Sequence, residues 1–250
     1  MQNIYNLLIK HFKNLKIKKG DNVLVYTKLS SFGIIDQNFH KKFINILIKY
    51  IGPKGTIAMP SYTFEDKNFI FKIKQIKENY STSVVIKEFF KKKVTRSKRL
   101  IHSHLILGNK ANIFKGKIDP SISLGKNSDF DLMTKNNFKC VYIGCSIKEG
   151  GTFLVHLEYL NNVPYRKKIK IKKRIRENNK IKIIDVNYFR RPKNISYDFD
   201  KTFGEIIKIG APVTKSKLRF GMSYSIYMKD FLHYGNKLFK KNIYAMIKNG

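Results

Sequence analysis

The 250-residue sequence contains no long apolar run and few cysteines. No uninterrupted apolar stretch approaches the roughly 18 residues that a membrane-spanning helix needs. Residues 1–15 lack the separate charged, apolar and small-residue regions of a signal peptide. The two cysteines, Cys140 and Cys145, flank an apolar stretch and form neither a CxxC pair nor a disulfide framework. We therefore expect a cytoplasmic protein without a membrane span, in which both thiols are buried.

Several common catalytic motifs are missing as well. No two glycines are separated by one residue, which excludes the GxG loops of dinucleotide-binding proteins, kinases and common acetyltransferases. The Walker A, GxSxG and HExxH patterns are also absent. His102 and His104 are spaced so that both rings would lie on one face of a strand, where the two thiols could complete a zinc site with them. Without a paired CxxC or HExxH motif, the sequence favours hydrogen-bonded strand histidines, and we expect no metal site.

Acidic residues are scarce: 17 Asp and Glu stand against 51 Lys and Arg, which gives a formal net charge of +34. Such a charge is typical of proteins that bind nucleic acid, anionic lipid or another polyanion. The lysines, however, occur along the whole chain among Ile and Asn, as a compositional bias on solvated faces would leave them. The aromatic residues mostly follow core periodicity, so nucleic acid is not the expected partner. A basic surface still favours small polyanions such as CoA or a nucleotide-sugar.

The first sixty residues alternate between helical and strand periodicity. Residues 4–15 and 39–51 repeat apolar positions at helical spacing, and residues 22–27 and 56–59 form buried strand patterns. This succession predicts an α/β fold in which a layered central sheet is flanked by helices. With 42% hydrophobic residues and no long linker, residues 1–250 are expected to form one domain.

The rest of the chain adds further elements and a hairpin. Two period-two runs, residues 168–172 and 180–183, surround a polar turn at 177–179 and predict an exposed β-hairpin in the C-terminal half. Its outward lysines would oppose edge-to-edge aggregation. The remaining patterns predict a helix over 84–93, strands over 102–107 and 140–144, and a helical segment over 221–247.

An ordered series of local patterns lies on these elements. Residues 20–33 form a strand and turn, and residues 52–56 with 59–64 form a second strand and its loop. Arg96-Ser97, His102-Ser103 and Gly108 fit the pattern R-S-x-H-P-x-H-S-x(4)-G, and residues 152–158 with 163–166 fit T-x-x-H-x-x-E…P-Y-R. In this order the patterns resemble the aminoglycoside 3-N-acetyltransferase family and its relatives from polysaccharide gene clusters.

The resemblance implies an acetyl-CoA-dependent N-acyltransferase with the cofactor along the turn after the first strand. Exposed backbone amides and serine hydroxyls at such a turn are suitable donors to phosphates and carbonyls. The alternative for residues 30–33 is an ordinary helix-capping turn. The residues that the resemblance places near the pantetheine or the phosphates are Tyr26, Thr27, Lys28, Leu29, Ser30, Ser31, Phe32, Gly33 and Ser103.

Acyl transfer to an amine also needs a base, and a histidine held by a carboxylate suits this role. The resemblance offers His156, Glu158 and His102 as catalytic residues; Glu158 keeps its six-residue distance to both Thr152 and Pro164. The family typically has histidine three residues before this glutamate, where the present chain has Val155. On a regular helix, His156 and Glu158 would point about 200° apart. His156 is therefore either a shifted base or a residue on an outward helix face.

Two more departures concern the substrate. Arg99 and Leu100 replace the usual His-Pro, and Tyr26 replaces a usual histidine on the first strand. A polycationic aminoglycoside would be repelled by a protein of this charge, so the sequence favours an anionic acceptor, such as a nucleotide-linked amino sugar of surface polysaccharide synthesis. The alternatives are an aminoglycoside acetyltransferase that confers antibiotic resistance and a catalytically impaired binding protein with a polyanionic partner. A homo-oligomer is compatible with the sequence.

Overall fold

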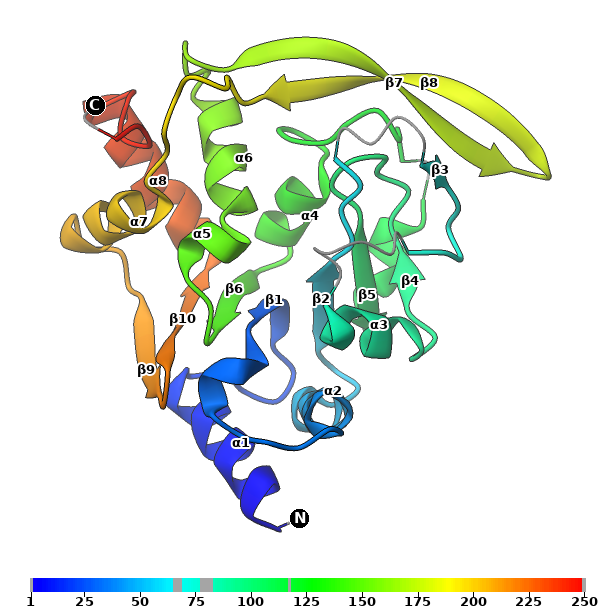
Figure 1. Ribbon diagram of the computed structural model, residues 1–250. Coiled ribbons are helices and arrows are strands. Elements are labelled where there is room, and N and C mark those ends of the chain that lie inside the picture. The colour runs from blue at the N-terminus through cyan, green and yellow to red at the C-terminus, as the bar shows by residue number, and fades with distance from the viewer. Residues whose placement is uncertain (1, 65–68, 77–82, 117, 249–250) are drawn as a thin grey trace.

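Seven strands form a mixed central sheet in the computed structural model, which describes residues 2–64, 69–76, 83–116 and 118–248 (Figure 1). The strand order is β4-β5-β2-β1-β6-β10-β9. Central strand β1 pairs in parallel with β2 and β6, while the other neighbours are antiparallel. The strands are β1 (Asn22–Thr27), β2 (Thr56–Pro60), β4 (Thr95–Arg96), β5 (His104–Gly108), β6 (Phe138–Ile143), β9 (Thr214–Leu218) and β10 (Gly221–Tyr227).

Helices cover both faces of this sheet because the side chains of its strands alternate. Val23 and Val25 of β1 pack in one core cluster, and Leu24 and Tyr26 pack in the other. The first cluster is covered by α1 (Gln2–Asn14), α2 (Phe39–Ile51) and α3 (Val84–Phe90), and the second by α4 (Asp129–Lys135), α6 (Thr152–Leu160), α7 (Phe199–Lys208) and α8 (Met228–Lys241). Short connections are η1 (Leu29–Phe32), η2 (Ala111–Phe114) and α5 (Ile147–Gly150). The predicted layered α/β fold is confirmed.

A long hairpin of β7 (Lys167–Glu177) and β8 (Lys180–Arg190) joins β3 (Ile70–Phe71) in a second sheet. Figure 1 shows it as a yellow-green arm that crosses above α4 and α6. Asn178 and Asn179 both have positive φ, 47° and 61°, as a two-residue I′ turn requires. Ile171, Ile175 and Val186 form its buried side. The hairpin predicted from the lysine alternation is therefore present.

The predicted boundaries differ from the structure in several places. The sequence pattern predicts a helix over residues 221–247, but residues 221–227 form β10, which pairs with β6 and β9. The helical prediction is wrong for these residues, where sheet pairing decides the conformation, and for residues 242–247, because α8 ends at Lys241. His102 lies before β5, whose first residue is His104. Within the described ranges no helix is long and apolar enough to span a membrane. One domain over residues 1–250 stays a prediction.

Candidate active site

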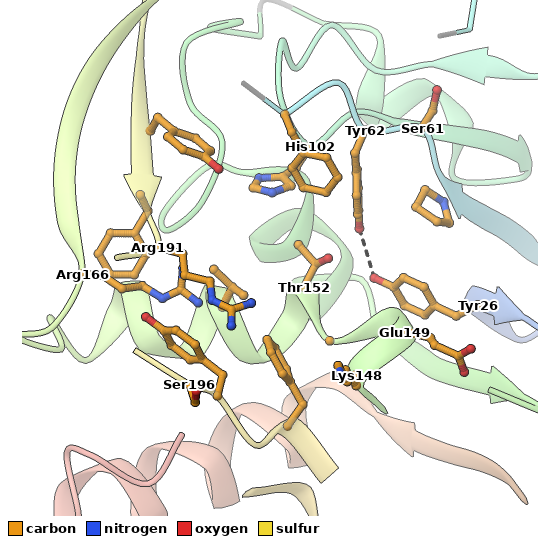
Figure 2. Close-up of a pocket in the computed structure, with 18 of the residues that line it drawn as sticks. Tyr26, Ser61, Tyr62, His102, Lys148, Glu149, Thr152, Arg166, Arg191 and Ser196 are labelled. Carbon is orange, nitrogen blue, oxygen red and sulfur yellow. Dashed lines mark hydrogen bonds between the residues drawn. The ribbon is translucent and has the colours of Figure 1, made fainter. Parts of the chain in front are cut away.

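A cavity of about 600 Å³ lies beyond the carboxyl end of β1, between α5, α6 and the hairpin (Figure 2). We call it the first cavity. Its walls combine aromatic rings, four basic side chains and several hydroxyl groups. It is lined by Tyr26, Pro60, Ser61, Tyr62, Phe64, Ile86, His102, Lys148, Glu149, Gly151, Thr152, Val155, Arg166, Tyr188, Phe189, Arg191, Ser196, Tyr197, Phe199 and Lys248.

Local packing explains why β1 and α5 meet at this cavity. Tyr26 is at the end of β1 and stacks on Tyr142 of β6, with ring centroids 5.1 Å apart. A Cβ atom at Gly150 would come within 2.7 Å of the Tyr26 ring and 2.8 Å of the Tyr142 ring. Glycine at the end of α5 therefore lets this helix pack directly against the two tyrosines. Thr152 and Val155 then present one side of α6 to the cavity.

The charge of the first cavity is mainly positive. Lys148, Arg166, Arg191 and Lys248 line it, and Glu149 is the one carboxylate in the lining that the structure describes. Glu149 forms an ion pair of 2.8 Å with Lys28, so part of its charge is already compensated. The guanidinium carbons of both arginines lie over the ring of Tyr197, at 4.8 and 4.4 Å from its centroid. Such a wall attracts anions.

A second cavity of about 760 Å³ adjoins the first, and Lys148 and Glu149 line both. Lys28, Ser31 and Cys145 belong to its lining. Ser31 Oγ donates a hydrogen bond of 2.5 Å to the carbonyl of Gly144, which has a φ of 66° in the turn after β6. The turns after β1 and β6 are thereby held side by side at the mouth of this cavity.

A chain of buried polar groups extends from the first cavity into the sheet. Tyr26 Oη lies 3.1 Å from Tyr62 Oη, which lies 3.3 Å from Nε2 of His104. Nδ1 of His104 lies 2.9 Å from Asp129 Oδ2, and Nε of Arg99 lies 3.0 Å from Asp129 Oδ1. His104, Asp129 and Arg99 are at most 2% exposed. Of these hydrogen-bonded residues, the two tyrosines line the cavity.

The ionisation of Asp129 follows from its partners. Burial alone would raise its pKa, but the hydrogen bond from His104, the charge of Arg99 and the hydroxyl of Ser97 hold the pKa below its usual value. Burial raises the pKa of Tyr62 and of Tyr26 well above that of a free phenol. At neutral pH, the hydrogen-bonded groups from the cavity inward are therefore two neutral phenols, a histidine and an ionised carboxylate.

Comparison with known proteins identifies the family. The sequence matches the profile of the aminoglycoside 3-N-acetyltransferases over residues 24–240. The chain belongs to this family. A search of curated proteins finds no significant match.

Solved structures with the acetyltransferase fold cover nearly the whole chain. AAC-IIIb with CoASH has a TM-score of 0.82 at 17% identity, covering 95% of this chain and 96% of that chain. YokD from Bacillus subtilis has a TM-score of 0.79 at 18% identity, with 95% and 99% covered. AAC-VIa bound to sisomicin has a TM-score of 0.80 at 13% identity, with 95% and 97% covered. At these identities, the likeness shows a shared fold.

Among the predicted catalytic residues, His156 lies outside the lining of the first cavity. Its ring packs on Phe130 and Phe153, and Nδ1 accepts a hydrogen bond from the amide of Gly125. At 2% exposure it is not on an outward face, so that alternative is wrong. Burial lowers its pKa to about 4. On this helix, Thr152 and Val155 face the cavity, and Val155 stands where the resemblance leads us to expect histidine.

Glu158 is directed to a different partner from His156, as their spacing on a regular helix requires. Its Oε2 lies 2.7 Å from Nε of Arg166 in an ion pair whose N–H is not aligned for a hydrogen bond. Burial raises the pKa of Glu158, and the charge of Arg166 opposes this rise without cancelling it. The carboxylate is fully buried, whereas Arg166 reaches the first cavity. Glu158 thus positions Arg166.

His102 lines the first cavity, where its ring contacts Tyr62 and Phe64 edge-on. Nδ1 is hydrogen-bonded to the hydroxyl of Ser123. Burial, reinforced by the neighbouring His104, lowers the pKa of His102 to about 3. Of the three predicted catalytic side chains, it is the one that the structure places at the cavity.

The predicted cofactor residues separate into accessible and buried groups. Tyr26 lines the first cavity, and Lys28 and Ser31 line the second. Phe32 is buried against His11 and Phe39, and Ser103 is buried with its hydroxyl donating to the Ser61 carbonyl at 2.5 Å. The others follow the strand into η1, which Gly33 caps with a φ of 69°: Thr27, Leu29, Ser30 and Gly33.

The sequence prediction missed Tyr62, His104 and Asp129 as a group. It considered His104 only as one of two strand histidines. A signal was present in the two histidines and the tyrosine-rich elements around the cavity, but the partners of His104 are separated from it by 25 and 42 residues along the chain. Only the fold brings them together.

Proposed function

We propose that the chain transfers the acetyl group of acetyl-CoA to the amino group of an anionic sugar, such as a nucleotide-linked amino sugar used in surface polysaccharide synthesis. Membership of the aminoglycoside 3-N-acetyltransferase family supports the reaction class. The observation that carries the choice of acceptor is the basic lining of the first cavity, in which four cationic side chains accompany one ion-paired carboxylate.

The second cavity is the proposed position of the cofactor. It adjoins the turn after β1, and its lining includes the ammonium groups of Lys28 and Lys148, which can contact phosphate groups, beside the carboxylates of Glu149 and Asp200. A CoA complex is known for the structurally similar AAC-IIIb. Because the two cavities share Lys148 and Glu149, a thioester reaching past α5 would meet an acceptor held in the first cavity.

The acceptor would contact both charge and aromatic surface. Arg166 and Arg191 can form paired hydrogen bonds with phosphate or carboxylate oxygens. Tyr188, Phe189 and Tyr197 offer faces for a sugar or a nucleobase. Related structures are described with a gentamicin and with sisomicin. A polycationic acceptor of that kind would approach four positive side chains here, which the Coulomb term opposes.

The proposal predicts that the protein prefers anionic acceptors to gentamicin and that Arg191 contributes to their binding. In an assay that follows CoA release, acetylation of amino-sugar nucleotides should proceed with a higher kcat/KM than acetylation of gentamicin. Replacing Arg191→Gln should raise the acceptor KM about tenfold, as expected when one charge-assisted contact is lost. The exposed Arg176 on β7 lines neither cavity. Arg176→Gln removes the same net charge and should leave the KM unchanged.

Two outcomes would contradict this assignment. A higher kcat/KM for gentamicin than for every anionic sugar tested would favour the antibiotic-modifying alternative. Equal KM increases in the Arg191→Gln and Arg176→Gln variants would show that overall charge, and not the cavity wall, attracts the acceptor. Calorimetry with acetyl-CoA adds a direct test, because absence of binding at millimolar ligand would contradict the enzyme itself.

A second candidate, a binding protein without catalytic activity, has one observation in its favour. Val155 lines the cavity at the position where the family has histidine. Tight binding of an anionic sugar without any acetyl transfer would support it.

A further inference from the structure

We propose that Tyr62, His104 and Asp129 form a proton relay that takes the proton from the attacking amine, with the hydroxyl of Tyr26 beside the point where the proton enters. This inference rests on the proposed N-acetyltransferase function. It gives a chemical role to a buried hydrogen-bonded chain that ends at the wall of the first cavity.

The direction of the hydrogen bonds follows from Asp129. An ionised carboxylate can only accept, so Nδ1 of His104 must carry the proton that it shares with Oδ2 at 2.9 Å. Nε2 of a neutral His104 then has a free lone pair, and Tyr62 donates its hydroxyl proton to it across 3.3 Å. The hydroxyl of Tyr26 in turn donates to Tyr62. In the series from Tyr26 through Tyr62 and His104 to Asp129, each group therefore donates its proton to the next one.

The relay connects the cavity with an interior that water does not reach. Tyr26 and Tyr62 line the cavity, and Figure 2 shows their hydroxyls meeting beside Thr152. His104 is 0% exposed. A proton accepted at the phenol oxygen of Tyr62 can therefore be stored on His104 without leaving the protein. Both phenols are neutral, so each can accept one proton while it releases another.

The charged surroundings of His104 suit a transient positive charge. Asp129 from α4 lies against Nδ1, and Arg99 shares the other oxygen of that carboxylate. His102 also acts on the site, and its low pKa of about 3 keeps it neutral, as burial keeps the Cys140 thiol beside the two tyrosines neutral. Ser97 donates to Asp129 at 2.5 Å and accepts from the amide of His104, which fixes both groups. The imidazolium formed during reaction would be paired with a carboxylate.

The other candidate bases are less well placed. His156 lies outside the cavity and is hydrogen-bonded to the amide of Gly125. His102 faces the cavity, but its pKa of about 3 makes it a weak base. Val155 occupies the position where the family has its histidine. Tyr62 is the cavity residue that leads directly to a histidine held by a carboxylate.

The reaction balances with these groups alone. The neutral amine attacks the thioester carbonyl carbon, a C–N bond forms and the carbonyl oxygen takes the π electrons. The nitrogen, now positive, gives a proton to Tyr62 Oη while the hydroxyl proton of Tyr62 passes to Nε2 of His104. When the oxyanion re-forms the carbonyl, the C–S bond breaks and sulfur keeps the electron pair. The proton returns from His104 through Tyr62 to the thiolate, which gives the amide and CoASH.

The test uses the full-length protein and three substitutions. Tyr62→Phe removes the hydroxyl that joins cavity and histidine, and His104→Gln removes the proton acceptor. Tyr142→Phe is the matched control, because its hydroxyl is buried, takes no part in the hydrogen bonds from Tyr26 to Asp129 and lies outside the cavity lining. Melting temperatures establish that each variant folds. Steady-state rates are then measured in mixtures of H₂O and D₂O.

We expect Tyr62→Phe and His104→Gln each to lower kcat about 100-fold or more, the range for losing acid–base assistance, with little change in acceptor KM. The rate of the unaltered protein should depend non-linearly on the deuterium fraction, because more than one proton moves. That curvature should disappear in Tyr62→Phe and persist in Tyr142→Phe. A purely structural role of Tyr62 would not change the number of protons in motion.

Nitrogen-15 spectra of the histidine rings supply a readout that needs no acceptor. The signal that vanishes in His104→Gln should show a protonated Nδ1 and a hydrogen-bonded Nε2, and the Nε2 signal should shift in Tyr62→Phe. A protonated Nε2 in the neutral ring would overturn the relay. So would a Tyr62→Phe variant that keeps the rate and the curvature of the unaltered protein, although acetyl transfer itself would then stand. If the unaltered protein acetylates no acceptor, both the function and the relay fail.

Discussion

Val155 decides how much of the family's chemistry this chain can share. It faces the first cavity from α6, three residues before Glu158, and a valine there can neither accept nor donate a proton. The neighbouring His156 does not replace it, because the helix turns its ring toward Phe130 and Phe153. A one-position shift on a helix moves a side chain by about 100°, so a shifted histidine leaves the site altogether.

Restoring histidine at this position gives a prediction at the residue scale. In a Tyr62→Phe background, Val155→His should raise kcat about tenfold or more, because the new imidazole would offer a base directly to the cavity. In the unaltered protein, the same substitution should change kcat little, since the relay already accepts the proton. The measurement is kcat for the two single variants and the double variant. No gain in the double variant would contradict the idea that Tyr62→Phe lacks only a proton acceptor.

The limits of sequence-based prediction are also clear at single residues. The resemblance led to His102 and Tyr26, both of which line the cavity, because they belong to local patterns. It did not lead to the pairing of His104 with Asp129, because two residues on different elements leave no spacing that could be recognised. Arg99, a departure from the family pattern, forms an ion pair with the buried carboxylate of Asp129.

Among the elements, the hairpin forms one wall of the first cavity. The end of β8 and the residues after it supply Tyr188, Phe189 and Arg191 to the wall. Asn178 and Asn179 determine the pairing of β7 with β8, since both adopt the left-handed conformation of a tight turn. The register at the tip therefore positions residues that lie at the opposite end of the hairpin.

The turn can be tested with a matched pair of substitutions. Asn179→Val should lower the free energy of unfolding by about 1 kcal/mol, because a β-branched residue is disfavoured at a φ of 61°. Asn179→Gly should leave the stability close to that of the unaltered protein, since glycine adopts this conformation readily. Urea unfolding followed by circular dichroism measures both. Equal stability of the two variants would contradict the I′ turn.

The elements were easier to predict than their boundaries. Strict alternation of lysine and isoleucine indicated the hairpin, and buried apolar runs indicated β1, β2 and β6. Met222, Tyr224 and Ile226 alternate with period two, which is a strand pattern, and the helical prediction extended the repeat of α8 too far toward the N-terminus. Pairing with β6 and β9 favours the strand, and that pairing is a long-range property that the local sequence does not contain.

At the scale of the whole molecule, three buried histidines besides His104 lie in separate places: His11 in α1, His102 before β5 and His156 in α6. Burial lowers the pKa of His11 to about 4, of His102 to about 3 and of His156 to about 4. The ordinary value is 6.5, so below that pH the unfolded chain binds more protons than the folded protein. The stability that these three groups contribute is therefore complete above pH 6.5 and is lost as the pH falls toward 4.

The free energy of unfolding should therefore decrease with falling pH at a predictable rate. Between pH 6 and 5, each of the three histidines should lower the free energy of unfolding by about 1 kcal/mol per pH unit, close to the limit of about 1.4 kcal/mol for one proton. His156→Gln should reduce the slope by one such increment, measured by urea unfolding across this range. The control is His233→Gln, which removes an exposed imidazole. Equal slopes in the two variants would contradict the assignment.

The thiol of Cys145 lines the proposed cofactor cavity. The proposed reaction would release CoASH into a cavity whose wall already contains the thiol of Cys145. If this thiol were ionised, it would attack a disulfide form of CoA bound beside it. Burial raises the pKa of Cys145 to about 12, so at neutral pH its sulfur carries a proton and does not act as a nucleophile. Under oxidising conditions the protein should remain free of covalently attached cofactor, and inhibition by oxidised CoA should be fully reversible without a reductant.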